Sequence, residues 1–328
     1  METPTGRMVI EIWPTSKPVF SKAHKNGYCA AVKRDAKIKW LALSLALTLF
    51  FFCSISAWAD SDKSCLWRVR SGRGTVYLMG SVHFLDKDSY PLPPSLEQAY
   101  QESPTVVFET DIGSMRKPEV QEKMIGLALL PDGDRMQNHL SSNTYRKLEG
   151  RLVQMKIDPV RFERLKPWMA AQTIAMIQLI KLGFHPQYGV DQYFFQKTRQ
   201  DGKEVHALES VDFQIELVSG LERYDQDAVI EKNLQEMDIL DSLINEMHRA
   251  WRSGDCPNLG KLMNRSLEGF PELYDNFITA RNRQWLPHIF AYIEKERDVL
   301  VIVGAGHLCG KNSLIDMLAE LGVVAEQL

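Results

Sequence analysis

The chain has 328 residues, of which 45% are hydrophobic and 25% are charged, and its formal net charge is −3. This length and composition predict one sizeable globular domain or two small ones and exclude bulk disorder. A net charge so close to zero argues against broad binding of nucleic acid or of acidic surfaces.

The N-terminal region has the features of an export signal. Residues 32–39 are basic, and residues 40–59 then run for twenty positions without a charge and close on Ala57-Trp58-Ala59. This order predicts a signal peptide over residues 32–59, with an uncleaved membrane anchor as the alternative. Both interpretations place residues 60–328 outside the cytoplasm, in the periplasm or another extracytoplasmic space, because the positive flank stays inside.

The exported part opens with strands and then becomes helical. Residues 65–80 predict two strands joined by a turn at Gly72-Arg73-Gly74. Residues 92–103 predict a helix with proline at its start, where a missing N–H costs little. Residues 105–110 are β-branched and apolar, as in a buried strand, and apolar side chains at helical spacing follow over about 115–200.

The second half returns from helices to strands. Residues 203–210 predict a short strand leading into a helix, and helices continue to about residue 295. Residues 298–307 predict the last buried strand and its turn, residues 311–322 a helix, and residues 323–328 an edge strand.

Strands therefore cluster at both ends of the exported part and helices fill its middle. This pattern predicts an α/β fold in which N- and C-terminal strands assemble a central mixed sheet, with a large helical insertion between them. We expect one such domain over residues 60–328. Residues 1–31 show no periodicity, which indicates a non-native start or a disordered tail.

Three cysteines lie in the exported part, at Cys65, Cys256 and Cys309. An oxidising compartment permits one disulfide among them and leaves one thiol over. We expect Cys65 to pair with Cys256, which would leave Cys309 free.

Two short stretches share one unusual pattern. In "GSVH" (80–83) and "GAGH" (304–307), an apolar strand ends at a glycine and a histidine stands three residues later. Glycine allows a sharp turn at a strand end, and open α/β sheets place ligands at the carboxyl ends of their strands. If the two strands are neighbours, His83 and His307 come together. Glu109 closes a third apolar strand and could complete a divalent-metal site, with Asp111 a weaker candidate.

Other interpretations of these turns stay open. They can be purely architectural. "GAGHLCG" superficially resembles a dinucleotide loop, but too little chain follows it for a nucleotide-binding half. Cys309 and His307 could form a thiolate–imidazole pair, although residues so close in sequence rarely reach that geometry.

Two further acidic residues have competing interpretations. Glu209 could be a ligand together with His206, but a cap or brace for the following helix is the favoured role of Glu209. His206 is expected to lie on a half-buried strand. Asp191 is favoured as a helix N-cap, with Gly189 before it, over a catalytic role.

The chain resembles the TraB/GumN family, to which the membrane-associated Tiki metalloproteases are related. The resemblance covers essentially all of residues 65–328. It rests on the two Gly-x-x-His turns together with "FET" at 108–110, "LKPWM" at 165–169, "GVDQYF" at 189–194, "GKEVHALESVDFQ" at 202–214 and "ARNRQW" at 280–285.

The resemblance implies a fold similar to the erythromycin-esterase/ChaN-like group and a divalent-metal-dependent hydrolase. It implies His83, His307 and Glu109 as metal ligands, with Glu109 alternatively the general base, and manganese or cobalt before zinc as the metal. It also implies that Arg281 stabilises an oxyanion or grips a substrate carboxylate. From the residues alone, Arg281 would be a solvated helix position or part of a structural ion pair.

The residues and the resemblance together predict an exported metal-dependent hydrolase, with a peptidase as the narrower expectation, that acts on a peptide or small molecule. The expected partners include no nucleic acid, and they include a membrane only through an uncleaved leader. The alternative is a non-enzymatic periplasmic binding or scaffold protein that keeps the fold.

Overall fold

The chain divides into two units, Met1–Ala57 and Trp58–Leu328, and only the second is described here. The computed structural model describes residues 63–72, 74–267, 269–294 and 297–328. The predicted leader over residues 32–59 and the predicted tail over residues 1–31 lie outside these residues. Within them, no helix combines the length and the apolar character needed to cross a membrane.

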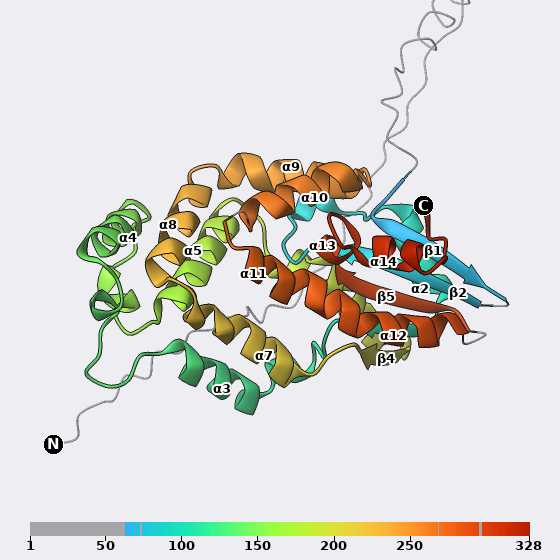
Figure 1. Cartoon of the computed structure of the whole chain (residues 1–328), viewed down its shortest axis with the longest axis horizontal. Helices are drawn as coiled ribbons and strands as arrows, with labels where there is room; N and C mark the ends of the chain where they lie inside the picture. The colour runs from blue at the N-terminus through green and yellow to red at the C-terminus, as the bar shows by residue number, and fades with distance from the viewer. Residues whose placement is uncertain (1–62, 73, 268, 295–296) are drawn as a thin grey trace, which may run out of the picture. The chain divides into compact units, whose positions relative to one another are not determined.

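A six-stranded mixed sheet forms the centre of the described unit (Figure 1). Its strands lie in the order β4-β3-β5-β2-β1-β6. Their bounds are β1 Leu66–Ser71, β2 Gly74–Ser81, β3 Thr105–Phe108, β4 Glu204–Ala207, β5 Val299–Gly304 and β6 Glu326–Gln327. Strands β4, β3, β5 and β2 run parallel, and β1 pairs antiparallel with both β2 and β6.

The predicted fold class is confirmed, because the C-terminal strand β5 is inserted between the N-terminal strands β2 and β3. Ile302 of β5 stands opposite Met79 of β2, and Val301 of β5 stands opposite Val107 of β3. A parallel strand between two neighbours is covered on both faces, which explains its unbroken apolar run. The sheet therefore cannot form until the two ends of the unit meet.

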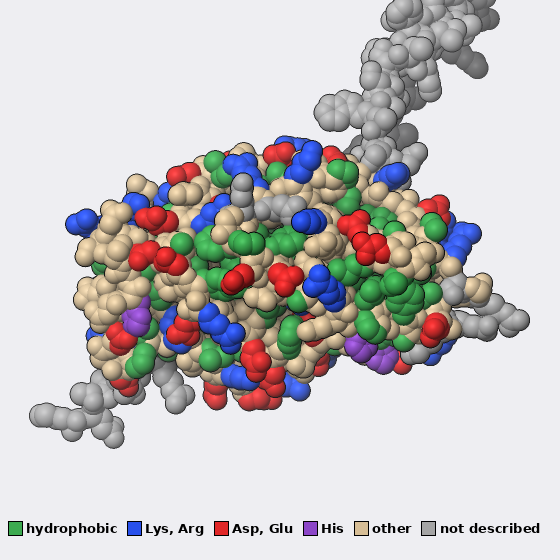
Figure 2. Space-filling view, in the orientation of Figure 1, with side chains coloured by type: hydrophobic (Ala, Val, Ile, Leu, Met, Phe, Trp, Pro, Cys, Tyr) green, Lys and Arg blue, Asp and Glu red, His purple; other side chains and the backbone are tan. Residues whose placement is uncertain are grey.

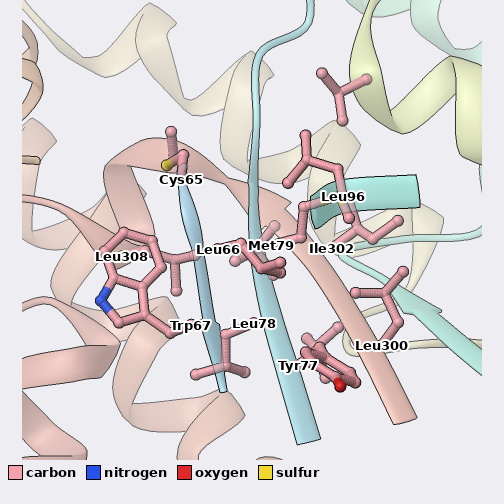
Figure 3. Close-up of a cluster of buried hydrophobic side chains, with 14 of the residues drawn as sticks. Cys65, Leu66, Trp67, Tyr77, Leu78, Met79, Leu96, Leu300, Ile302 and Leu308 are labelled. Atoms are coloured by element: carbon pink, nitrogen blue, oxygen red, sulfur yellow. The ribbon is translucent and has the colours of Figure 1, made fainter. Parts of the chain in front are cut away.

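Alternation along the strands builds a core on each face of the sheet. Leu96 of helix α2 (Pro94–Glu102) lies beside Leu300 and Ile302, whereas Trp67 lies with Leu308 on the other side of the strands (Figure 3). Leu300 and Ile302 are two residues apart and so share a face. Helix α12 (Ala280–Glu294) crosses the face opposite α2 and packs on β1 and β2 (Figure 1).

The predicted helical middle is confirmed and has a core of its own. Helices α4, α5 and α8 gather at the end away from the sheet (Figure 1). Leu148, Ile174 and Ile230, one from each helix, are almost fully buried there. The helices of the middle are α3 Pro118–Ala128, α4 Ser142–Gln154, α5 Pro167–Lys181, α6 Val190–Asp201, α7 Val211–Ser219, α8 Gln226–Met237, α9 Leu240–Arg252, α10 Cys256–Ser266 and α11 Pro271–Tyr274.

The last elements return to the sheet. A π-helical turn, η7 (Asp275–Thr279), joins α11 to α12, and the four-residue helix α13 (Ala305–Leu308) follows β5 directly. Helix α14 (Leu314–Glu320) then begins at a capping box between Ser313 and Asp316. The predicted helix over 311–322 is thereby confirmed with a later start.

The predicted Cys65–Cys256 pairing is wrong, because Cys256 forms a disulfide with Cys309. The first residue of α10 lies over the segment that follows α13, and the two Cα atoms are 5.1 Å apart, within the range that a disulfide spans. Cys65 is buried instead at the start of β1. A Cβ placed on Gly80 would lie 2.3 Å from its Sγ, so this glycine leaves room for Cys65.

Candidate functional site

Three of the predicted site residues follow neighbouring parallel strands at the same edge of the sheet. Glu109 comes directly after β3, His307 lies in α13 just beyond β5, and His83 lies two residues beyond β2. Ser81 of β2 stands opposite Gly304 of β5 in the register. The carboxyl ends of the strands meet here, as the sequence predicted.

A buried guanidinium joins this edge to two carboxylates. Nη2 of Arg281 donates to Oε2 of Glu109 at 2.6 Å and to Oε1 of Glu209 at 2.7 Å. Its Nη1 lies 3.0 Å from Nε2 of His307. Arg281 is only 5% exposed. Two carboxylates around one guanidinium leave the cluster with one formal negative charge in excess.

Helix α12 and the π-helical turn before it fix the position of Arg281. Nη1 also donates to the carbonyl of Phe277, inside the turn, at 3.1 Å. The guanidinium carbon lies 4.6 Å from the ring centre of Trp285, one helical turn further on. Arginine stacks on aromatic faces in this way, and π-helical turns occur often at functional sites.

Glu109 is ionised and fully engaged. Its Oε1 accepts from the amide of Gly304 at 2.6 Å, while Oε2 accepts from Arg281. Burial on its own would raise the pKa of this carboxyl, but Arg281, the neighbouring His307 and His83, and the Gly304 amide more than offset it, so the pKa falls to about 2. A Cβ on Gly304 would lie 3.2 Å from Oε1, so the glycine allows the carboxylate to approach.

His307 is a neutral imidazole with a defined orientation. Its Nδ1 lies 2.7 Å from Oδ1 of Asn282, and an amide oxygen only accepts, so the ring proton is on Nδ1. Nε2 then carries the lone pair and accepts from Arg281. Burial lowers the pKa of His307 to about 3. The neutral form, expected for a metal-binding histidine, is the form present.

His83 lies at the margin of the cluster. Its Nδ1 is 3.0 Å from Oδ1 of Asp191, in the first turn of α6, and its side chain is 63% exposed. The charge of Asp191 raises the pKa of His83 to about 9. The chain holds this loop closely, since a Cβ on Gly189 would lie 2.4 Å from the carbonyl oxygen of His83. Asp191 therefore contacts His83 and is not the N-cap, which is Gly189.

The donors at this edge suit a divalent metal in type. Imidazole nitrogen and carboxylate oxygen are ordinary ligands for such ions, and Nδ1 of each histidine is tied to an acceptor, as is usual around metals. However, the described residues contain no group of three or more His, Cys, Asp and Glu that could hold a metal ion. Arg281 engages Glu109 and His307 on the atoms that a metal would need. The assignment of His83, Glu109 and His307 as ligands stays a prediction.

Three residues have roles at the candidate site that the sequence did not predict. Glu209 was expected to brace a helix, and it does bind Gln214 of α7, but it also accepts from Arg281 and from Nε1 of Trp285. Asn282 and Asp191 each orient a histidine. Both lie in stretches that carry the family resemblance, "ARNRQW" and "GVDQYF", which was the available signal.

The remaining candidates lie outside the cluster. Asp111 accepts from the amide and hydroxyl of Ser114 and so caps a turn. His206 was expected on a half-buried strand, but β4 is exposed along its length, and His206 contacts Glu204. The thiolate hypothesis for Cys309 is excluded, because its sulfur is in the disulfide.

A comparison with known protein families shows which family this chain belongs to. The sequence profile of the TraB/PrgY/gumN family matches residues 65–327. The chain belongs to the TraB/PrgY/gumN family. The match spans every strand and helix described above, including the residues around Arg281.

Individual relatives of this family are distant in sequence. The uncharacterized protein YbaP of Escherichia coli is 26% identical over 248 residues, which cover 75% of this chain and 89% of that protein. Metalloprotease TIKI2 of Danio rerio is 21% identical over 319 residues, which cover 80% of this chain and 61% of that protein. Metalloprotease TIKI1 of Xenopus tropicalis is 20% identical over 82% of this chain and 62% of its own length. No solved structure matches the chain significantly.

Proposed function

We propose that this chain is an exported hydrolase that requires a divalent metal and acts on peptides. The observation that carries the proposal is the buried cluster of Glu109, Glu209, Arg281 and His307 at the carboxyl edge of the sheet. Its excess negative charge and its neutral imidazole favour a bound cation. The distant similarity to proteins named metalloproteases supports the same reaction class.

Glu109, His307 and His83 are the residues that would hold the metal in this proposal. His83, whose pKa is raised to about 9, would have to lose a proton to bind the ion. Manganese or cobalt is the first choice and zinc the alternative. When bound, such an ion polarises a carbonyl and lowers the pKa of a coordinated water. A pKa of about 2 makes Glu109 a weak base at neutral pH, which favours the ligand role over the general-base role. An ion bound at Oε2 of Glu109 would displace the hydrogen bond from Arg281.

Arg281 would act on the substrate's developing negative charge. Its guanidinium stays charged, but its N–H groups now bind Glu109, Glu209, His307 and Phe277. Those that face Glu109 and His307 would turn to an oxyanion or a carboxylate once these two residues bind the ion instead. Glu209, Trp285 and Phe277 fix its position before any substrate arrives. The structural ion pair that the residues alone suggested for Arg281 is thus present, and the proposed role uses it.

Two observations support export. The predicted signal over residues 32–59 precedes the domain. The Cys256–Cys309 disulfide is of a kind that persists in oxidising compartments. Acidic and basic side chains are interspersed on the face shown in Figure 2, as the small formal net charge of the chain leads one to expect.

The test is metal-stimulated cleavage of a peptide library by the purified protein, with manganese, cobalt and zinc in turn. We expect cleavage by the wild type and a loss of about 10²-fold or more in Glu109→Gln, because a buried charge at the reacting centre is removed. Glu204→Gln, on the exposed strand β4, is the matched control and should retain activity. If the folded wild type cleaves nothing with any of the metals, the binding or scaffold alternative becomes the better account.

A further inference from the structure

An apolar cavity adjoins the candidate site. Its volume is about 210 Å³, and its inner wall is formed by Ser81–Leu85 after β2 and by Gly304 and Ala305 after β5. The same two segments carry His83 and the Gly304 amide that binds Glu109. A group seated in the cavity would therefore lie next to the cluster of charged residues.

The outer wall comes from the helical insertion and is apolar. It is formed by Leu179 of α5, Ile244 and Met247 of α9, and Leu259 and Met263 of α10. Met263 packs against the second glycine of "GAGH": a Cβ on Gly306 would lie 2.3 Å from its Cε. The motif glycine thus permits this wall to close on the strand ends.

Ionic recognition inside the cavity has little support from its lining. His248 is the ionisable residue of the outer wall. Its Nε2 lies 3.1 Å from Oγ of Ser89 and its ring stacks on Trp251. Burial lowers the pKa of His248, so the ring is neutral at pH 7. The other ionisable residue of the lining, His83 of the inner wall, is already paired with Asp191. A charged group placed here would therefore lose its hydration without an unoccupied ionic partner.

The size of the cavity matches one large side chain. An apolar cavity of about 150 Å³ accepts benzene, whereas sites for whole drug-sized ligands start at about 300 Å³. A volume of about 210 Å³ therefore matches a benzyl group or a large aliphatic side chain.

We propose that this cavity is a specificity pocket that receives one large apolar side chain of a peptide, beside the bond that is cleaved at the candidate site. The substrate class is then peptides with phenylalanine, leucine or methionine at that position. This assignment rests on the proposed function for the chemistry, but the pocket can be tested by binding alone.

The binding test uses N-acetyl-phenylalaninamide as the probe and N-acetyl-glycinamide, which lacks the side chain, as the control compound. Binding of each compound is measured by NMR. The wild type should bind the first and not the second. Ile244→Phe, which fills the cavity, should weaken binding at least tenfold. Ile177→Phe, a matched change on α5 that packs against the other core, should leave binding unchanged. Equal affinity for the two probes, or equal effects of the two variants on binding, would contradict the assignment of this cavity as a specificity pocket.

The cleavage test separates the pocket from the chemistry. Wild-type kcat/KM should favour phenylalanine over alanine at the cleaved position by at least about tenfold, the scale that apolar pockets achieve. Ile244→Phe should abolish that preference, and Ile244→Ala, which enlarges the cavity, should move it towards tryptophan. Cleavage without side-chain preference would overturn the pocket while the proposed function stands. Selective binding without any cleavage would uphold the pocket and contradict the proposed function.

Discussion

Arg281 is the residue on which the charge balance of the candidate site depends. It is almost fully buried, and its guanidinium lies between Glu109, Glu209 and His307. Buried charges are tolerated only when they are paired and hydrogen-bonded. Removing this cation leaves two carboxylates facing each other away from water.

Arg281→Met is expected to lower the free energy of unfolding by about 3–5 kcal/mol, because it leaves buried charge uncompensated. Arg283→Met, two residues along α12, is the control: that side chain is 65% exposed and lies 3.8 Å from Asp275. The control should change stability by no more than about 0.5 kcal/mol. Urea denaturation of both variants measures the difference. Equal losses of unfolding free energy in the two variants would contradict a stabilising role for the buried network.

The pairing of His83 with Asp191 predicts a pH dependence. The pKa of His83 in the folded chain, about 9, lies above the usual value of 6.5. The stabilisation from this pair is therefore complete below about pH 6.5 and is lost as the pH rises through 9. In Asp191→Asn, NMR titration in the presence of EDTA should return the pKa of His83 towards 6.5. A His83 pKa that is the same in the two proteins contradicts the assignment.

At the scale of elements, two connections hold the strand edge to the helical insertion. Cys256 at the start of α10 is bonded to Cys309, two residues after His307. Nε1 of Trp251, in α9, donates to the carbonyl of Gly80 at 2.8 Å. Helices α9 and α10, which line the proposed pocket, are thus anchored to the two Gly-x-x-His turns.

Reduction of the disulfide is expected to lower the free energy of unfolding by about 4 kcal/mol, the chain-entropy value for a sequence separation of 53 residues. Thermal or urea unfolding with and without a phosphine reductant measures the loss. The control is the double variant Cys256→Ser/Cys309→Ser, which should be insensitive to reductant. A wild type that is equally stable in both conditions rules out this bond as a stabilising connection.

At the scale of the whole molecule, the arrangement of strands could be predicted and the side-chain partners could not. Apolar strands ending in glycine at residues 80 and 304 predicted a shared edge, since parallel neighbours end on the same side. The disulfide was mispredicted because pairing depends on where α10 lies, and helix positions follow from tertiary packing. Glu209 could not be predicted as a partner of Arg281 either, because their contact depends on where α12 lies against the sheet edge.

The helical insertion supplies part of the cavity beside the candidate site. Its helices α5, α9 and α10 form the outer wall of the cavity beside the candidate site. The sheet edge supplies the charged cluster and the insertion supplies the apolar surface next to it. In the proposed function, the first would carry the chemistry and the second would choose the substrate.

The most direct test of the central claim is calorimetric titration of manganese into the purified, metal-free protein. The account predicts one bound ion per chain in the wild type, loss of that binding in His307→Gln, and unchanged binding in His206→Gln, the control on the exposed strand β4. Absence of binding by the folded wild type, or binding that survives His307→Gln, would contradict a metal site at this edge of the sheet.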